Sequence, residues 1–308
     1  MQTLSIFTFL ILLFLGGFWS GNLVRKNYFA KIADHEGRTN FLLLGMNGGS
    51  APGDDLTDTM IFLSLNQKTG KAAMISIPRD IWLDSLKIKI NAAYHYGGAD
   101  LVRQTVEEVL GQKIDYLAVV SFDGFKQVID ALGGVRINVA RAFDDYQYPI
   151  KGRENDLCNG DKELKCRYEH VHFDAGWQTM NGETALKFVR SRKAEGEEGT
   201  DFARSQRQEL LLKSLKQTIL DEKLYLHPQK LLAALKAAEA AIKTDLTPDQ
   251  YGTLLELAAK MNWEEVKTYS LAENLLTNPK SHYSKQWVLL PKAGNWAEVH
   301  RFVAEFLK

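Results

Sequence analysis

The stretch FLLLGMNGGSAPGDDLTDTMIFLSLNQKTGKAAMISI, residues 41–77, decides the fold. Phe41 to Gly45 has the length and apolar character of a buried strand, and it runs into a loop rich in glycine and aspartate. Thr59 to Leu65 and Lys71 to Ile77 are two β-prone runs, separated by residues with the composition of a hairpin turn. Pro78 cannot donate to a strand ladder and ends the second run. The stretch therefore predicts a buried strand followed by a β-hairpin.

Outward from this stretch, helical and extended patterns alternate. Apolar residues recur at helical spacing from Leu101 to Leu110, and Tyr116 to Phe122 is the next strand. A short helix spans the region from Phe125 to Leu132 and is followed by the strand Val135 to Val139. This alternation predicts a layered α/β domain.

The second half of the chain is more varied. Residues 143–169 are polar and irregular, which indicates a surface insertion, and helices are expected at 183–189 and at about 201–220. A strand-like run, Trp287 to Leu290, precedes a final helix. No segment rich in Gly, Ser or Pro separates residues 227–308 from the rest, so we expect a single ectodomain over residues 40–308.

An uncharged apolar run occupies residues 3–24. About 20 apolar residues span a bilayer core, and Trp19 lies where an interfacial aromatic is expected. A cleaved signal peptide is the alternative, although the run lacks a basic n-region. Arg25 and Lys26 follow the run, so the positive-inside rule favours a cytoplasmic C-terminus. We expect an N-terminal transmembrane anchor at residues 1–24 and a juxtamembrane linker at residues 25–39.

Composition excludes some classes of partner. The 308 residues include 38 basic and 38 acidic side chains, a formal net charge of +0, so no global field favours nucleic acid. The two cysteines, Cys158 and Cys166, lie close together in a polar loop. They form a disulfide suited to an oxidising exterior or remain two free thiols, whereas a metal site normally needs four ligands.

The helix expected from Asp201 onward carries polar residues on its inner face. At about 100° per residue, Asp201, Arg204 and Gln208 share one sector with Leu211 and Leu215 further along. Because burying unpaired charge is costly, these side chains either pair with each other or line a pocket. Arg207 lies to one side of this sector and could reach the same rim.

Further arginines stand at loop and strand ends. Arg190 and Arg192 flank a serine upstream of that helix, and Arg79 and Asp80 follow the strand that ends at Pro78, a usual place for ligands in α/β sheets. A guanidinium presents a planar fork that matches phosphate oxygens. Several inward arginines suit a diphosphate, and a network of salt bridges holding the insertion is the alternative.

Acidic residues and histidines raise the question of a metal. Asp54, Asp55 and Asp58 lie beside a strand, and Mg²⁺ prefers one or two carboxylates plus phosphate oxygens. A solvated acidic loop is the simpler interpretation for Asp54 and Asp55. His170 and His172 lie two apart on one strand face, without an evident third ligand. Signatures of nucleotide-binding loops, serine hydrolases and zinc proteases are absent from the sequence.

At these residues the chain resembles the LytR-CpsA-Psr family, also called the cell-envelope-related attenuator domain. The matching segments keep the order and spacing of that family, clearly from about Asn40 into the long helix and weakly beyond it. They are SIPRD (76–80), KINAAY (89–94) with Gly97-Gly98, DALGGV (130–135), AG (175–176), NGETAL (181–186), RSR (190–192) and DFARSQRQ (201–208).

The resemblance implies a three-layer α-β-α sandwich around a mixed central sheet, with an apolar tunnel for a polyprenyl chain. It also implies a membrane-anchored, extracytoplasmic enzyme that transfers a glycopolymer from a polyprenyl-pyrophosphate carrier onto a peptidoglycan hydroxyl. Hydrolysis of the pyrophosphate lipid and a non-catalytic, lipid-binding regulatory role are the alternatives.

Site roles follow from the resemblance residue by residue. Asp58 is expected to hold Mg²⁺, and Asp201 to orient arginines or to activate the acceptor. Arg79 and Arg204 are expected to be catalytic and to bind the pyrophosphate together with Arg190, Arg192 and Gln208.

Two positions depart from the family pattern. Gly45-Met46-Asn47 stands where many members have an aspartate as the third residue, and Leu56 replaces an arginine. Asn47 cannot supply a second negative charge to a metal, so Mg²⁺ is expected to bind more weakly or to rely on Asp54, Asp55 or the substrate.

Overall fold

The computed structural model describes residues 29–48, 55–153, 155–221, 228–261, 265–271 and 274–308. Within these ranges no helix is both long and apolar enough to cross a bilayer. The apolar run at residues 3–24 lies outside the described residues, so the transmembrane anchor stays a prediction.

The chain divides into two compact units. One is formed by Asp123–Ala237, and the other by the described residues up to Phe122 together with Ala238–Lys308. Each unit is presented by itself, and the single ectodomain expected over residues 40–308 stays a prediction.

A six-stranded sheet forms the centre of the unit that contains both the N-terminal and the C-terminal residues. Its strand order is β11-β6-β1-β2-β3-β12. The strands are β1 (Arg38–Met46), β2 (Thr57–Asn66), β3 (Ala72–Ser76), β6 (Tyr116–Ser121), β11 (Ile242–Thr244) and β12 (Lys267–Ser270). Strand β1 pairs antiparallel with β2 and parallel with β6, so the sheet is mixed, as predicted.

The predicted buried strand and hairpin are confirmed as β1, β2 and β3. Seven consecutive residues of β1 are buried, which explains why its sequence is a continuous apolar run and not an alternating one. Strand β2 is also buried over most of its length and pairs with β3 across the predicted turn.

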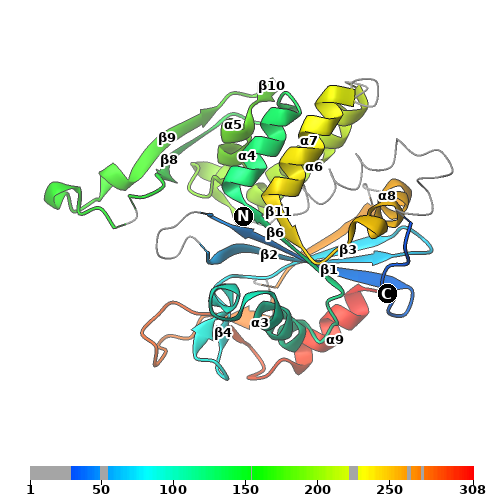
Figure 1. The fold of residues 1–308 in the computed structure, drawn as a ribbon. Coiled ribbons are helices and arrows are strands. Elements are labelled where there is room, and N and C mark those ends of the chain that lie inside the picture. Colours follow the sequence, from blue (N-terminus) through cyan, green and yellow to red (C-terminus); the bar gives the residue numbers. More distant parts are fainter. Residues whose placement is uncertain (1–28, 49–54, 154, 222–227, 262–264, 272–273) are drawn as a thin grey trace. The chain divides into compact units, whose positions relative to one another are not determined.

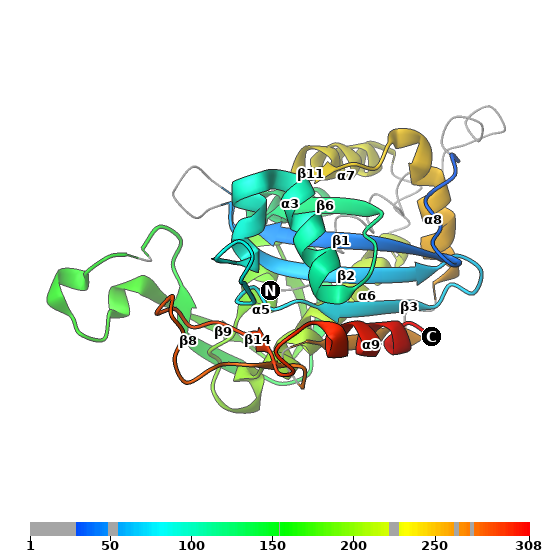
Figure 2. The same ribbon diagram turned by 90° about the horizontal axis from the view of Figure 1, so that it is seen from below.

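Helices lie on both faces of this sheet (Figure 1). Helices α3 (Ala93–Leu110) and α9 (Ala297–Phe306) cover one face, as Figure 2 shows from below, and α8 (Tyr251–Lys260) lies on the other. On the face of α3 and α9 the core joins strand and helix side chains. Its fully buried members include Leu42, Leu44, Phe62, Ile75, Val102, Val106 and Val303.

Short elements complete this unit. They are β4 (Trp82–Leu83), β5 (Ile88–Lys89), the 3-10 turn η1 (Ile90–Ala92), β13 (Leu276–Thr277), β14 (Leu290–Pro291) and the 3-10 turn η6 (Pro248–Gln250). The strand expected at Trp287 to Leu290 is therefore reduced to its last residue, which begins β14. Helix α3 begins earlier than expected and is interrupted at Gly97 and Gly98.

The Asp123–Ala237 unit is built around helices. It contains most of α4 (Phe122–Ala131) and α7 (Pro228–Ala241), together with β7 (Val135–Val139), β10 (Gly176–Met180), α5 (Gly182–Arg190) and α6 (Asp201–Asp221). Strands β7 and β10 pair antiparallel, and α6 packs against β7. The predicted helices and the strand at Val135 to Val139 are confirmed.

The expectation of an irregular insertion over residues 143–169 is wrong in part. Strands β8 (Phe143–Pro149) and β9 (Tyr168–Phe173) pair antiparallel and form an arm that extends away from α4 and α5 (Figure 1). Two 3-10 turns, η2 (Cys158–Gly160) and η3 (Lys165–Arg167), lie in its tip. Polar side chains outnumber apolar ones on these strands, so hydrophobic periodicity is a weak signal there.

Candidate active site

Two of the predicted arginines frame the end of helix α5. The helix begins at Asn181, whose side chain accepts a hydrogen bond from the Thr184 amide at 2.9 Å, a standard N-cap. It ends at Arg190, and Ser191 is its C-cap residue. Ser191 is fully buried, whereas Arg192 beyond it is exposed. The chain thus leaves the helix with arginines on either side of a buried serine.

Asp145 of β8 holds this turn. Its carboxylate is buried, with 1% of its surface exposed. Oδ2 accepts hydrogen bonds from the Ser191 hydroxyl at 2.6 Å, the Arg192 amide at 3.1 Å and the Lys193 amide at 3.2 Å. Three donors on one buried oxygen satisfy much of the charge that burial would otherwise penalise.

Arg190 lies against the buried ring of Tyr148. Its guanidinium carbon is 5.6 Å from the ring centroid, and Nη1 donates to the tyrosine hydroxyl at 3.3 Å. Burial raises the pKa of Tyr148 to about 12, although the Arg190 charge acts in the opposite direction. Tyr148 therefore stays a neutral phenol at physiological pH, and Arg190 lies against an uncharged ring.

Helix α6 carries two buried arginines. The Thr200 side chain accepts from the Ala203 amide at 3.1 Å and so caps its start. Arg204 and Arg207 are 7% and 4% exposed, and Leu211 and Leu215 are also buried. The predicted inward direction of Arg204 is confirmed. Asp201 and Gln208 lie in α6, but their side chains are outside the described part of the structure.

Arg207 was expected only to reach a pocket rim, but its guanidinium makes several bonds within the protein. Its guanidinium donates to the carbonyls of Phe188 at 3.1 Å, Ser191 at 2.8 Å and Glu198 at 2.9 Å. Nη1 also bonds the Glu198 carboxylate at 2.7 Å, and the guanidinium carbon lies 4.6 Å from the Phe143 ring centroid. Burial lowers the pKa of Arg207, while the carboxylates of Glu198 and Asp145 act to raise it. This arginine is bound to the protein on several sides.

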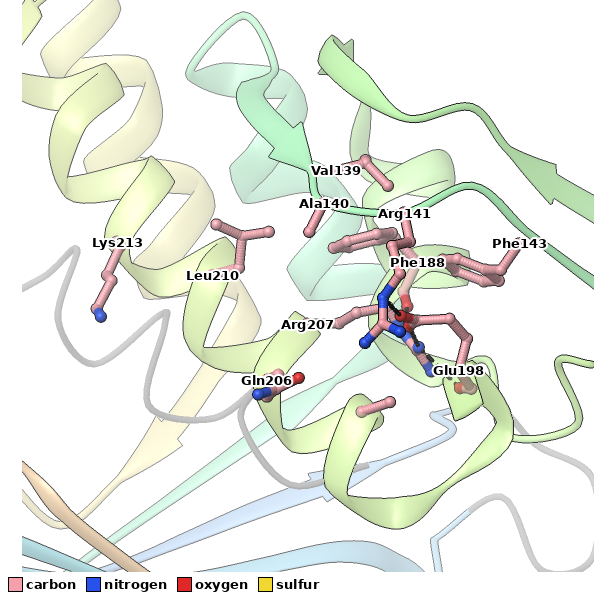
Figure 3. Close-up of a pocket in the computed structure, with 11 residues that line it drawn as sticks. Val139, Ala140, Arg141, Phe143, Phe188, Glu198, Gln206, Arg207, Leu210 and Lys213 are labelled. Atoms are coloured by element: carbon pink, nitrogen blue, oxygen red, sulfur yellow. Dashed lines mark hydrogen bonds and ion pairs between the residues drawn. The ribbon is translucent and has the colours of Figure 1, made fainter. Parts of the chain in front are cut away.

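A pocket of about 290 Å³ borders Arg207 (Figure 3). Apolar side chains of β7, α5 and α6 form much of its wall, and Figure 3 shows Arg207 and Glu198 facing each other at one side. Arg141 lies nearby and forms an ion pair with Glu197. Among the described residues, Arg190, Arg192 and Arg204 do not line this pocket.

The other predicted site residues belong to the sheet unit. Arg79 Nη1 donates to Asp58 Oδ1 at 2.6 Å, and Arg79 Nε is 3.6 Å from Asp80 Oδ2. Burial acts to lower the pKa of Arg79, but the carboxylates of Asp58 and Asp80 outweigh it and raise this pKa. Asp80 Oδ1 also bonds Lys89 Nζ at 2.6 Å. The structure therefore brings Asp58, Arg79 and Asp80 together, as a network at the end of β3.

The donor set around Asp58 is compatible with a divalent cation. A carboxylate has two oxygens, so Asp58 can bind Arg79 through one of them and a cation through the other. Asp55 instead bonds His95 Nδ1 at 2.5 Å, and this hydrogen bond lowers the pKa of Asp55. Asp54 lies outside the described residues. The described residues thus offer Asp58 as one carboxylate, which Mg²⁺ can combine with phosphate oxygens.

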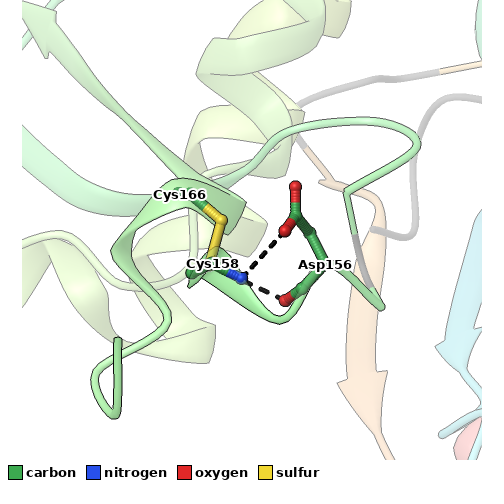
Figure 4. A group of neighbouring side chains, drawn as sticks. All are labelled: Asp156, Cys158 and Cys166. Carbon is green, nitrogen blue, oxygen red and sulfur yellow. Dashed lines mark hydrogen bonds between the residues drawn. A yellow bond between two sulfur atoms is a disulfide. The ribbon is translucent and has the colours of Figure 1, made fainter. Parts of the chain in front are cut away.

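The two cysteines form a disulfide (Figure 4). Among the described residues, the one group of three potential metal ligands with mutually close ligand atoms is Asp156, Cys158 and Cys166. Because the two sulfur atoms are bonded to each other, neither is a thiolate ligand, and this group is not a metal site.

His170 and His172 do not form a compact ligand set with a third residue in the part of the chain that the structure describes. Both instead bond the same Asp144 oxygen, His170 Nε2 at 2.7 Å and His172 Nδ1 at 2.8 Å. Their spacing along β9 therefore serves cross-strand hydrogen bonds to β8.

Sequence reasoning missed Asp145 and Ser191, and it did not foresee the bonds of Arg207 to backbone carbonyls. Asp145 is one of two adjacent aspartates in a polar segment and is 46 residues from Ser191 in sequence. Pairing across such a distance is not visible in local patterns.

The comparisons with known proteins agree with these observations. The sequence profile of the LytR_cpsA_psr family matches residues 22–297. The chain is 34% identical over 232 residues to polyisoprenyl-teichoic acid–peptidoglycan teichoic acid transferase TagU of Oceanobacillus iheyensis, covering 70% of this chain and 61% of the relative. Identity to the transferase TagV of Bacillus subtilis is 29% over 258 residues, covering 82% of this chain and 60% of TagV.

A solved structure shows the same fold. The crystal structure of B. subtilis TagV matches with a TM-score of 0.60 and 26% identity, covering 89% of this chain and 98% of that chain. The chain spans about 60% of the length of the two curated relatives. Because the family profile covers nearly all of the residues from the end of the apolar run to α9, the chain belongs to the LytR_cpsA_psr family.

Proposed function

We propose that this protein is a phosphotransferase that moves a glycopolymer from a polyprenyl-pyrophosphate carrier onto a peptidoglycan hydroxyl. Membership of the family and the transferase names of TagU and TagV support the proposal. We further propose that residues 1–24 anchor the chain in the cell membrane with the remainder outside the cytoplasm, which is the orientation that the family resemblance implies and the opposite of the one that Arg25 and Lys26 favour.

The observation that carries the proposal is the placement of the motif arginines. Arg204 is buried, Arg190 lies half-buried against a neutral tyrosine, and Arg192 is exposed at the same turn. Guanidinium groups that are partly withdrawn from water bind phosphate oxygens more strongly than fully exposed ones, because the local dielectric is lower. Such an arrangement suits a doubly charged headgroup such as a pyrophosphate.

The proposed roles follow from the chemistry of the groups. Arg79, Arg190, Arg192, Arg204 and Gln208 bind the pyrophosphate oxygens and stabilise the charge that develops on them. The acceptor hydroxyl oxygen attacks the sugar-linked phosphorus, and the bond from this phosphorus to the bridging oxygen breaks. Polyprenyl phosphate leaves with that oxygen. The acceptor proton passes to Asp201 or to solvent.

We propose Asp58 as the protein ligand of Mg²⁺. When bound, the ion would neutralise negative charge on the pyrophosphate. Arg79 would keep Asp58 oriented through the hydrogen bond that the two already share. This site is weaker in charge than the family pattern because Asn47 is neutral.

The test uses the full chain in detergent with a polyprenyl-pyrophosphate-linked glycan. Release of polyprenyl phosphate should require a peptidoglycan acceptor, and Arg79→Ala should abolish it. Release without an acceptor, together with free glycan phosphate, would instead identify a hydrolase. Retention of the intact lipid through extraction and mass spectrometry, with no turnover under any condition, would leave a lipid-binding regulator.

A further inference from the structure

The turn that bears Arg190 and Arg192 is held by two buried groups of opposite charge. Asp145 binds it through the Ser191 hydroxyl and the amides of Arg192 and Lys193. Arg207 binds it through the Ser191 carbonyl, and it binds the chain before and after the turn through the carbonyls of Phe188 and Glu198. Ser191 is thus bonded to both groups, its hydroxyl to Asp145 and its carbonyl to Arg207.

The turn is more rigidly held than an ordinary surface loop. Loops that carry binding residues are usually mobile, and ordering them on ligand binding costs conformational entropy. Here the donors and acceptors of the turn are fixed before any ligand arrives. A strand, β8, supplies Asp145, and a helix, α6, supplies Arg207, so both anchors come from regular structure.

Contacts beyond the turn fix both anchors. Asp145 Oδ1 accepts from the Gln147 amide at 2.9 Å, which holds the carboxylate in its own strand. Arg207 is ion-paired with Glu198 and packed over Phe143. Asp145 is 1% exposed, and Arg207, at 4% exposed, directs its hydrogen bonds to backbone carbonyls and to Glu198. The bonds of both side chains are thus made to the protein, and they act on the residues that they hold.

We infer that Asp145 and Arg207 are positioning residues that preset the spacing of Arg190 and Arg192 for the two phosphates of the carrier. The inference rests on the proposed function and adds to it residues that touch neither substrate nor metal. Phosphate recognition by paired guanidinium groups depends on geometry, and misplacement by about 1 Å can cost about a hundredfold in rate. A preset turn avoids the ordering cost at the moment of binding.

A purely structural role is the competing explanation, and a double-mutant cycle separates the two. The full chain in detergent would be titrated with inorganic pyrophosphate, and affinity would be expressed per folded molecule. Asp145→Asn keeps the shape but turns a carboxylate that accepts several bonds into an amide. Its effect would be measured in the wild-type background and in a background carrying both Arg190→Gln and Arg192→Gln.

The positioning role predicts that Asp145→Asn weakens pyrophosphate binding about tenfold in the wild-type background and at most about twofold when both arginines are absent. Ser191→Ala, which removes one of the three bonds to Oδ2, should weaken binding by about threefold. Two surface controls, Asp174→Asn and Arg136→Gln, remove matched charges in the same unit and should leave affinity unchanged.

The outcomes are distinct. Equal losses in the two backgrounds, or no loss from Asp145→Asn or Ser191→Ala, would overturn the positioning role while leaving the proposed function in place. No pyrophosphate binding by the wild type would overturn both. If Asp145→Asn does not fold, Ser191→Ala carried through the same two backgrounds decides the question, because it leaves both buried charges intact.

Discussion

Four arginines of the motif set occupy four different environments. Arg79 is paired with carboxylates, Arg190 lies on a neutral ring, Arg192 is exposed and Arg204 is buried in the first turns of α6. The arginine count of the sequence could not distinguish them. The helical wheel did place Arg204 inward, because the same sector continues into Leu211 and Leu215.

Replacing Arg79 or Arg204 by alanine should reduce acceptor-dependent transfer by at least about a hundredfold, because each removes a preorganised charge from the proposed pyrophosphate site. Arg79→Ala should change the thermal unfolding midpoint little, since its ion pairs are partly exposed. Turnover with a defined lipid donor and a melting curve check both points. Wild-type turnover in either variant would contradict the site assignment.

Gly199 is a residue whose replacement acts through the backbone. An added Cβ would lie 2.1 Å from the Ala194 carbonyl oxygen, a backbone atom that cannot move without shifting the chain. Gly199→Ala should therefore destabilise the protein by about 1–3 kcal/mol. Gly199 does not have a positive φ, whereas Gly152 has a φ of 83° and an added Cβ there meets nothing within 4 Å. Urea unfolding of Gly199→Ala beside the exposed-site variant Gly152→Ala therefore compares a steric cost with a backbone cost. A negligible loss in Gly199→Ala would contradict the steric prediction, because it would show that the backbone shifts easily to accept the added methyl group.

At the scale of elements, the β8–β9 arm shows why pattern alone misled. Val171 and Phe173 of β9 are buried, and the histidines between and before them face outward to Asp144. That is ordinary strand alternation, but it spans few residues and is diluted by charged side chains. By contrast, β1 and β2 were predictable because burial on both faces leaves a long apolar run.

The Asp144 bonds make the arm sensitive to pH. The hydrogen bond to His170, followed by that to His172, lowers the pKa of Asp144 below 3.8. Bonds to Asp174 and Asp144 raise the pKa of His172 above 6.5. The ionised Asp144 carboxylate stabilises the arm at pH values above 3.8, and this stabilisation is lost as the pH falls through the lowered pKa of Asp144. The protonated His172 ring stabilises the arm at pH values below 6.5, and this stabilisation is lost as the pH rises through the raised pKa of His172.

Asp144→Asn should accordingly lower arm stability most at about pH 5.5 and much less at about pH 8.5. Hydrogen exchange of β8 and β9 amides in wild type and variant measures this locally. A pH-independent difference would show that the bonds act as neutral hydrogen bonds. Asp123→Asn, which alters a carboxylate paired with lysines, serves as the control without histidine.

The disulfide should stabilise only the tip of the arm. Cys158 and Cys166 are eight residues apart, and a loop of that length limits the entropic gain to about 2–3 kcal/mol. Replacing both cysteines by serine should speed proteolysis within residues 150–167 and leave the main melting transition close to that of the wild type. A large drop in that transition would mean that the tip supports more of the fold than its exposure suggests.

At the scale of the whole molecule, a layered α/β domain followed from the alternation of strands and helices, whereas the mixed sheet with helices on both faces was implied by the family resemblance. The membrane anchor was predicted from the same sequence and is open to a direct experiment. Cells expressing the full chain should hold it in the membrane fraction, accessible to protease from outside. Deleting residues 3–24 should release it, and a chain that remains in the membrane after the deletion would disprove the anchor.

What could not be predicted is the long-range pairing. Strand β12 lies parallel to β3, and β11 lies antiparallel to β6, although each pair is separated by more than a hundred residues. Neither short strand has a distinctive sequence, and each becomes a strand by pairing with the edge that β3 or β6 offers. The same applies to Asp145 and Ser191, whose contact joins an arm to a helix end.

Both edges of the central sheet are closed by these late segments, β11 at one side and β12 at the other. While the chain is being synthesised, β3 and β6 present unpaired rows of amide and carbonyl groups until residues 242–270 arrive. A nascent chain halted before that point has two unpaired sheet edges that can pair with other chains. The parallel pairing of β12 with β3 is slow because the loop between them is long. Premature termination would therefore yield an aggregating fragment, and a chaperone that shields the incomplete sheet would favour folding.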